Sequence, residues 1–170
     1  MARAYLESPI GLLRIGTDQR KLRSVRLVEE REEEMPNPVT GKAIEQLEEY
    51  FAGKREQFSI VSMPPGTPFQ LQVWGMVKKI PYGKVATYGQ IASAIGRPSA
   101  CRAVANAVGQ NPALIFCPCH RVVAAGGLGG FSAGLEAKRK LLTLEGVEIA
   151  EKSPFSEKFL FTFEENCATI

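Results

Sequence analysis

The chain has 170 residues, of which 45% are hydrophobic and 23% charged, and its net charge is +3. This composition is that of an ordinary globular protein, and the length fits one domain or a small domain beside a medium one. No apolar run reaches the roughly 20 residues of a membrane span, and the N-terminus lacks a signal pattern. We therefore expect no membrane partner, an intracellular location and reduced thiols.

The positive charge is concentrated in one part of the chain. Residues 68–150 carry nine Lys and Arg against three Glu, a net charge of +6, whereas residues 1–67 carry −1 and residues 151–170 carry −2. A basic segment favours an anionic partner such as nucleic acid. A solvated charged face would produce the same pattern, so charge alone leaves both interpretations open.

The N-terminal part predicts strands followed by one helix. Residues 4–18 indicate two short strands around a turn at Ser8-Pro9, and residues 21–30 a third strand with alternating apolar positions. Residues 40–55 have apolar side chains at helical spacing, with Thr40 as the cap and Gly53 as the stop.

Residues 58–69 predict a strand that runs into a proline-rich connector. This connector is the best candidate for a domain boundary, because prolines and glycine interrupt regular structure.

Beyond the connector the pattern is helical. Residues 68–80, 87–96 and 97–112 each predict a helix, and Gly109 lies near the end of the third. The tight link Gly96-Arg97-Pro98 between the last two suggests a helix-turn-helix. A helical bundle without DNA-binding function has the same spacing, so this interpretation stays open.

The third of these helices is rich in small residues and carries one large charged side chain, Arg102. Small side chains let a helix bring its backbone close to another surface. Close packing of this helix against a neighbouring helix would explain the small residues equally well. The small residues are Ala100, Ala103, Ala105 and Ala107.

A glycine-rich loop and an amphipathic helix complete the pattern. The loop spans residues 126–134, where glycine allows a close approach of the backbone. The helix spans residues 134–146 and presents Leu135, Leu141, Leu142 and Leu144.

The stretch FCPCHRVV, residues 116–123, holds the only histidine of the chain. The four cysteines, at positions 101, 117, 119 and 167, form no CxxC pair, and His120 adjoins Cys119 instead of lying a helical turn away. We therefore expect no metal site. A lone cysteine is most often an inert buried residue, and we expect this of Cys101 and Cys167.

Cys119 and His120 have the chemistry of an activated nucleophile. The thiolate is the reactive form of cysteine, and an imidazole can accept its proton. If residues 114–123 form a strand, the two side chains point to opposite faces, and a water or a bend at Pro118 must connect them. An imidazole base also needs an orienting acceptor, for which Glu145 is the best candidate. An inert Cys119 remains the alternative at this point.

Read together, several segments resemble the O6-alkylguanine-DNA alkyltransferase family. The resemblance spans residues 68–148 in order and with family-like spacing, and the SPIG hairpin near the N-terminus also looks like this family. The matching segments are IPYGKVATYGQIA (80–92), RPSACRAVANAVGQNP (97–112), PCHRVV (118–123), FSAGL (131–135) and KLLTLEG (140–146).

The resemblance implies an α/β fold in two domains. Residues 1–66 would form a ribonuclease-H-like N-terminal α/β domain. Residues 67–150 would form a mainly helical C-terminal domain with a winged helix-turn-helix and the active-site cysteine. Residues 151–170 would be a C-terminal extension, to which no role is assigned.

The resemblance also implies direct-reversal DNA repair, in which Cys119 irreversibly takes an alkyl group from O6 of guanine. The protein would be consumed and would need no cofactor. His120, Glu145 and a water would convert Cys119 to the thiolate. The water would connect the Cys119 and His120 side chains, which a strand would place on opposite faces. Tyr88 would donate a hydrogen bond to the guanine ring. The Cys119 and Val122 carbonyls and the Ser132 amide would read the guanine edge.

The implied partner is double-stranded DNA with O6-alkylguanine, bound through the minor groove. Ser99, Ala100 and Ala103 would lie at the DNA, and Arg102 would hold the space of the flipped nucleotide. Asn111 and Arg121 would brace the active-site segment.

The family resemblance also leaves several properties open. We expect a monomer, with cooperation along DNA undecided, in the cytoplasm or, in a eukaryote, the nucleus. Activity on O4-alkylthymine stays open. Some members bind zinc in the N-terminal domain, but residues 1–67 contain neither Cys nor His.

Two other functions compete with this one. A relative that only binds and marks alkylated DNA would lack cysteine at the nucleophile position, whereas Cys119 is present here. A cysteine-dependent hydrolase or redox protein would turn over or form a Cys117–Cys119 disulfide, and it would leave the alanine-rich helix with Arg102 unexplained. Phe131 and Ala133 depart from residues familiar in some members, which leaves the accepted alkyl size open.

Overall fold

A computed structural model describes residues 1–62, 64–149 and 154–163. The chain folds as two compact units. The first comprises residues 1–65 and 112–116, and the second residues 66–111 and 117–170. Residues 151–153 and 164–170 of the predicted extension, and the prediction for Cys167, lie outside the described residues.

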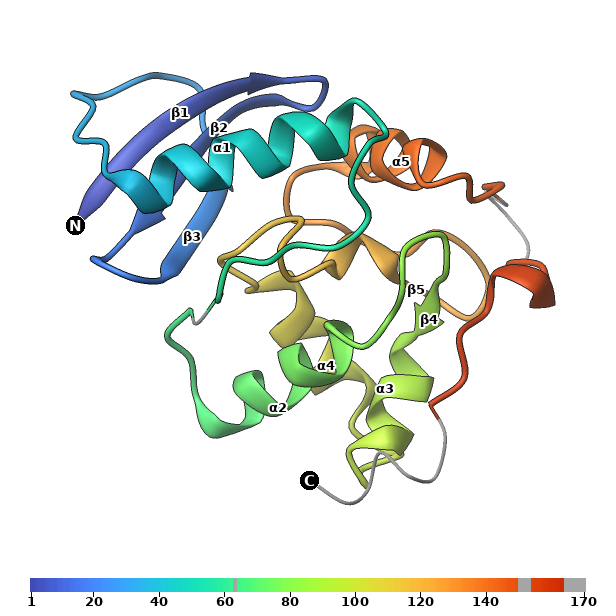
Figure 1. Ribbon diagram of the computed structural model, residues 1–170. Helices are drawn as coiled ribbons and strands as arrows, with labels where there is room; N and C mark the ends of the chain where they lie inside the picture. Colours follow the sequence, from blue (N-terminus) through green and yellow to red (C-terminus); the bar gives the residue numbers. More distant parts are fainter. Residues whose placement is uncertain (63, 150–153, 164–170) are drawn as a thin grey trace. The chain divides into compact units, whose positions relative to one another are not determined.

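The first unit is a three-stranded antiparallel sheet with one helix packed against it (Figure 1). The strands, in the order β1-β2-β3, are Ala2–Ser8, Gly11–Thr17 and Leu22–Leu27. The helix is α1, Pro38–Phe51. Alternating residues of the strands, Leu13 and Ile15 among them, are fully buried. The predicted strands and helix are confirmed.

Helix α1 begins earlier than predicted. Its cap is Asn37, whose side chain accepts from the Thr40 amide at 2.9 Å, while the Thr40 hydroxyl accepts from the Asn37 amide at 2.9 Å. The prediction of Thr40 as the cap is therefore wrong, because Pro38 takes the first helical position, where a missing N–H costs nothing.

The strand predicted within residues 58–69 is reduced to one bridge, between Leu22 and Ser62. Earlier in this segment the Ser59 amide has a side-chain partner instead, since it donates to the Gln46 side chain at 3.1 Å. The excursion of residues 112–116 into the first unit was not predicted. Here Val25 bonds Pro112 and Leu114 through the backbone, at 2.9 and 3.1 Å.

In the described part of the second unit there are four α-helices (Figure 1). They are α2, Pro68–Val77, α3, Tyr88–Ala94, α4, Cys101–Gly109, and α5, Leu135–Leu144. Helices α2 and α3 begin with capping boxes, from Thr67 to Gln70 and from Thr87 to Gln90. Two predicted apolar positions, Leu71 and Leu135, are exposed.

Helix α4 is shorter than predicted. The Ala100 amide donates to the Arg97 carbonyl at 2.9 Å, so residues 97–100 form a turn and Ser99 and Ala100 precede the helix. Helices α3 and α4 pack against each other across this turn, as a helix-turn-helix requires.

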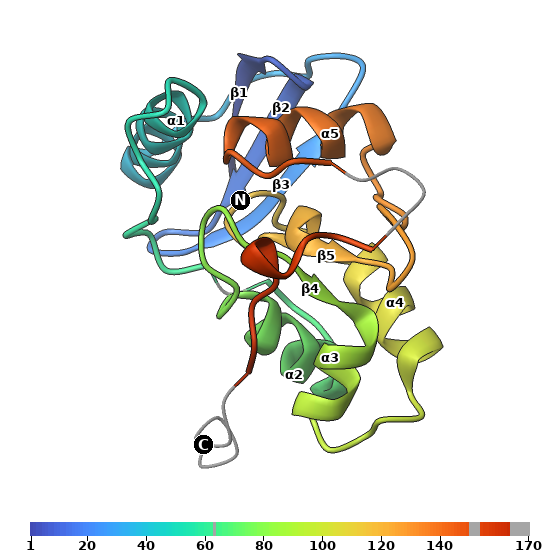
Figure 2. The same ribbon diagram turned by 90° about the vertical axis from the view of Figure 1, so that its right-hand side faces the viewer.

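Two short strands bring distant parts of this unit together. Strand β4, Ala86–Thr87, pairs in parallel with β5, Val122–Val123 (Figure 2). Tyr88 directly follows β4, and Cys119–Arg121 directly precede β5. No helix within the described residues is long and apolar enough to cross a membrane.

Candidate active site

Cys119 lies in a single 3₁₀ turn, Cys119–Arg121, and not in a strand. The strand that the sequence analysis considered for residues 114–123 is therefore not formed, except for β5 at its end. The chain bends at Pro118, where φ is −80° and ψ is 62°. In a 3₁₀ turn with three residues per turn, successive side chains point about 120° apart and not 180°. All three residues of the turn are buried.

Asn111 holds the segment that carries Cys119. Its Nδ2 lies 2.8 Å from the Cys117 carbonyl oxygen and 3.1 Å from Cys119 Sγ. Asn111 and Cys117 flank the 112–116 excursion, so this amide ties its two ends together. The bracing role predicted for Asn111 agrees with these contacts.

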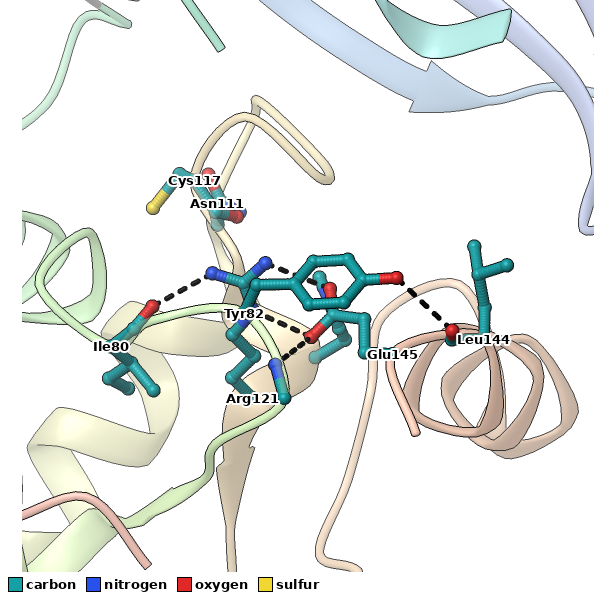
Figure 3. Close-up of polar contacts among 9 residues, drawn as sticks. Ile80, Tyr82, Asn111, Cys117, Arg121, Leu144 and Glu145 are labelled. Carbon is teal, nitrogen blue, oxygen red and sulfur yellow. Dashed lines mark hydrogen bonds and ion pairs between the residues drawn. The ribbon is translucent and has the colours of Figure 1, made fainter. Parts of the chain in front are cut away.

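Glu145 joins His120 and Arg121 (Figure 3 shows the Arg121 contacts). His120 Nε2 lies 2.7 Å from Glu145 Oε1, and the Arg121 guanidinium donates to both carboxylate oxygens at 2.8 Å. Arg121 also donates to the Ile80 carbonyl at 2.8 Å. The His120 and Glu145 side chains are fully buried. The structure thus places Glu145 within hydrogen-bond distance of His120, and its role as the orienting acceptor stays a prediction.

The electrostatics of this group favour a neutral His120 beside an ionised Glu145. Burial raises the pKa of Glu145, but His120 and Arg121 outweigh burial and hold it well below its usual range. Burial lowers the pKa of His120, although Glu145 acts in the opposite direction. A neutral His120 that donates from Nε2 to Glu145 has its lone pair on Nδ1. Among the described residues, none makes a hydrogen bond to that Nδ1.

Opposing effects act on the pKa of the Cys119 thiol. Burial raises its pKa to about 11, while Asn111, the positive charge of Lys138 and two backbone amides act to lower it. Cys117 is also buried, and burial raises its pKa even further. Cys101 is exposed, so the prediction of a buried Cys101 is wrong. The described cysteines are all free thiols.

Lys138 is a site residue that the sequence analysis missed. It is fully buried in α5, and its Nζ donates to the Val122 carbonyl at 2.6 Å and to the Gly130 carbonyl at 2.9 Å. It therefore ties β5 to the glycine-rich loop. Burial lowers its pKa to about 8, and Cys119 acts in the opposite direction. Its spacing from Leu141 and Leu142, on the same helix face, was the signal that could have revealed it.

Tyr88 lies at the edge of a cavity of about 380 Å³ in the second unit. The cavity is lined by α4 and by the glycine-rich loop, including Ser132. At Gly129, where φ is +74°, a Cβ atom would come within 3.0 Å of the Tyr88 hydroxyl, so only glycine fits there without displacement. Burial raises the pKa of Tyr88, and a backbone hydrogen bond from Gly130 acts in the opposite direction.

The predicted DNA-contacting residues of the helix-turn-helix form a separate group. Ser99, Arg102 and Ala103 are exposed, and Ala100 is partly exposed. Ala107, in contrast, is buried, and its carbonyl accepts from Trp74 Nε1 at 2.8 Å. The small residues therefore serve both purposes: some face solvent and others allow α4 to pack closely on α2.

The structure thus brings most of the predicted residues together, in two sets. Six of them are buried, while Tyr88 and Ser132 line the cavity. The six are Cys119, His120, Glu145, Asn111, Arg121 and Val122. No group of three or more potential metal ligands is found among the described residues.

Replacing Lys138 with Met should slow alkylation of Cys119 at neutral pH. A nearby cation favours the thiolate, so its removal raises the pKa of Cys119 and moves the rate–pH curve to higher pH. We expect a shift of about one pH unit and so about a tenfold lower rate at pH 7.5. The rate at which iodoacetamide modifies Cys119 itself, located by mass spectrometry and measured between pH 6 and 10, checks this, because Cys101 is also a free thiol and is exposed.

Lys138→Arg is the matched control because it keeps the charge. An unshifted pH profile in Lys138→Met, in a variant that unfolds at the wild-type temperature, would show that Lys138 does not act on the thiol.

Family models match almost the whole chain. Residues 1–65 match the ribonuclease-like domain of 6-O-methylguanine DNA methyltransferase, and residues 68–147 match its DNA-binding domain. The predicted fold class, a ribonuclease-like α/β domain followed by a helical domain, is thereby confirmed.

Known proteins agree. The methylated-DNA–protein-cysteine methyltransferase of Methanosarcina acetivorans is 43% identical, over 84% of this chain and 97% of its own. That of Haemophilus influenzae is 39% identical, over 91% of both chains. The crystal structure of Mycobacterium tuberculosis OGT in complex with DNA has a TM-score of 0.78 and 41% identity, over 85% of this chain and 92% of its own.

The chain therefore belongs to the 6-O-methylguanine DNA methyltransferase family.

Proposed function

We propose that the protein repairs DNA by moving an alkyl group from O6 of guanine to Cys119. The Cys119 sulfur forms a bond to the alkyl carbon, the bond from that carbon to O6 breaks, and its electron pair remains on the guanine, which takes up one proton in place of the one that the Cys119 thiol gives up. The products are an S-alkylcysteine and an unmodified guanine, and no cofactor takes part. The observation that carries the proposal is the buried Cys119 thiol beside the His120–Glu145 pair, in a chain of this family.

His120 is the base that takes the thiol proton. Its Nε2–H is held by Glu145, which directs the Nδ1 lone pair away from the carboxylate. A water carries the proton from Cys119 to Nδ1, and the imidazolium that forms is stabilised by Glu145. Arg121 acts as a brace, since both of its bonds to Glu145 and the bond to Ile80 fix the carboxylate.

The base enters the cavity lined by Tyr88 and Ser132. Its volume of about 380 Å³ lies within the range of small-ligand sites, roughly 300–1,000 Å³. Tyr88 donates from its hydroxyl to the guanine ring and eases departure of the base. The Cys119 and Val122 carbonyls and the Ser132 amide read the guanine edge. The half-buried Phe131 lines the same cavity and bears on the alkyl size accepted.

The exposed face of the helix-turn-helix binds the minor groove of the DNA. The net charge of +6 over residues 68–150 supports an anionic partner. Ser99, Ala100 and Ala103 allow a close approach, and Arg102 takes the space of the flipped nucleotide. We further propose that the protein acts as a monomer, in the cytoplasm or, in a eukaryote, the nucleus. Cooperation along DNA and activity on O4-alkylthymine are the open parts of this proposal.

Replacing Arg102 with Ala should slow repair of duplex DNA about tenfold or more, because the flipped state loses a stabilisation on the order of 1–3 kcal/mol. The reaction with free O6-alkylguanine base needs no flipping and should stay within about twofold of wild type. Single-turnover rates on the two substrates check this, and Arg139→Ala, in α5, serves as a charge-matched control. An equal loss on both substrates would contradict the flipping role.

The stoichiometry tests the proposal as a whole. With methylated duplex in excess, repair should rise in proportion to the protein added and stop at one event per molecule. Continued turnover would indicate a hydrolase. Binding without repair would indicate a protein that only marks the lesion.

A further inference from the structure

Residues 154–163 lie beyond the end of the family-model match at residue 147, yet they belong to the second compact unit. They bridge in parallel to the residue that precedes β4, through the pair Val85 and Leu160. The Val85 amide donates to the Phe159 carbonyl, and the Phe161 amide donates to the Val85 carbonyl, each at 2.8 Å. We name residues 154–163 the C-terminal strap.

The strap is anchored in the hydrophobic core of the second unit. Phe155 is 5% exposed and belongs to a cluster with Val85, Val123 and Leu142, against which Phe159 and Leu160 also pack. This cluster therefore joins the strap to the residues next to β4 and in β5. An element that merely lay on the surface would not share the core of the active-site strands.

Gln90 connects the strap to the start of α3. Its Oε1 accepts from the Thr87 amide at 2.8 Å, which is one half of the capping box. Its Nε2 donates to the Phe161 carbonyl at 2.9 Å. One side chain thus fixes both the strap and the residue immediately before Tyr88.

Tyr88 receives its position from this arrangement. It is the first residue of α3, where the backbone is set by β4 on one side and by the cap on the other. The strap bonds to the backbone of Val85, before β4, and to the side chain of Gln90, within the cap, so it has one contact on each side of Tyr88.

We propose that the C-terminal strap is a positioning segment for the Tyr88 hydroxyl. This inference rests on the proposed function, in which Tyr88 donates to the guanine ring. The strap touches no reacting atom. It restricts the start of α3, so that the hydroxyl stays where the base binds, against Gly129 and Gly130.

The test separates the strap contact from the helix cap. Gln90→Glu keeps the oxygen that accepts from Thr87 and suits a helix N-terminus, but it removes the donor to Phe161. Phe161→Pro removes the amide that bonds to Val85, and Phe161→Ala is its matched control because it keeps that amide. Ser156→Ala, at an exposed strap position, is a second control.

The measurements are the single-turnover rate at saturating methylated duplex and, separately, the dissociation constant for that duplex. Gln90→Glu and Phe161→Pro should each lower the rate about three- to tenfold, because a small misplacement of a reacting group is costly. The affinity of these variants for DNA should stay near wild type, and so should the rates of both control variants.

A double-mutant cycle with Tyr88→Phe decides how the strap acts. If it acts through the hydroxyl, Gln90→Glu should change the rate of Tyr88→Phe by less than about twofold, since there is no hydroxyl left to misplace. If the strap only stabilises the fold, the two losses should multiply, and the proposal is overturned.

The outcomes also separate this inference from the proposed function. Wild-type rates for Gln90→Glu and Phe161→Pro, beside a slow Tyr88→Phe, would overturn the strap alone. A wild-type rate for Tyr88→Phe, with methyl transfer to Cys119 intact, would overturn the role of Tyr88 and the strap with it.

Discussion

Cys119→Ser should abolish alkyl transfer while DNA binding stays within about twofold of wild type. The hydroxyl of serine is far less acidic than a thiol, so His120 cannot produce a useful concentration of the anion. Loss of a nucleophile of this kind lowers the rate by at least about 10³-fold. Cys119 is 2% exposed, whereas Ser99, Arg102 and Ala103 of the helix-turn-helix are exposed, so the DNA surface should be unaffected.

The control for this variant is Cys117→Ala, which removes the neighbouring buried thiol and should retain transfer. A rate that falls equally in Cys117→Ala would point to the Cys117–Cys119 redox pair considered from the sequence. Transfer that survives in Cys119→Ser would show that another residue is the acceptor. Gel-shift and single-turnover assays on the same preparations separate binding from transfer.

Glu145→Gln should destabilise the protein by about 3–5 kcal/mol, the usual result of removing one partner of a buried ion pair. The Arg121 side chain is 7% exposed and would keep a buried charge without its carboxylate. For a chain of this size the melting temperature should fall by roughly 10 °C. Thermal unfolding followed by circular dichroism measures both wild type and variant.

Glu136→Gln is the matched control, because Glu136 pairs with Lys140 on the exposed side of α5 at 3.7 Å. An exposed pair contributes little, so its loss should cost less than about 0.5 kcal/mol. Equal melting temperatures for Glu145→Gln and wild type would contradict the structural importance given to the Arg121–Glu145 pair.

Much of the site could be predicted because its residues lie in short, distinctive segments. The need of an imidazole base for an acceptor identified Glu145 from chemistry alone, and the structure places its Oε1 2.7 Å from His120 Nε2. The roles of Tyr88, Arg102 and Asn111 came from the family resemblance, and those roles remain predictions.

The parts that could not be predicted depend on contacts between distant segments. The helical spacing of Lys138 could have indicated that it is buried, but only the fold shows that its Nζ meets two backbone carbonyls. Residues 112–116 belong to the first unit through backbone bonds to Val25, which leave no trace in side-chain pattern. The C-terminal strap likewise depends on a bridge to Val85.

The most direct measurement is to incubate the protein with a duplex that holds one O6-methylguanine. The protein is then digested and the masses of its peptides are measured by mass spectrometry. The account predicts one methyl group on the peptide that contains Cys119, in an amount equal to the guanine restored. A duplex that is bound but unchanged, or a methyl group on any other residue, would contradict it.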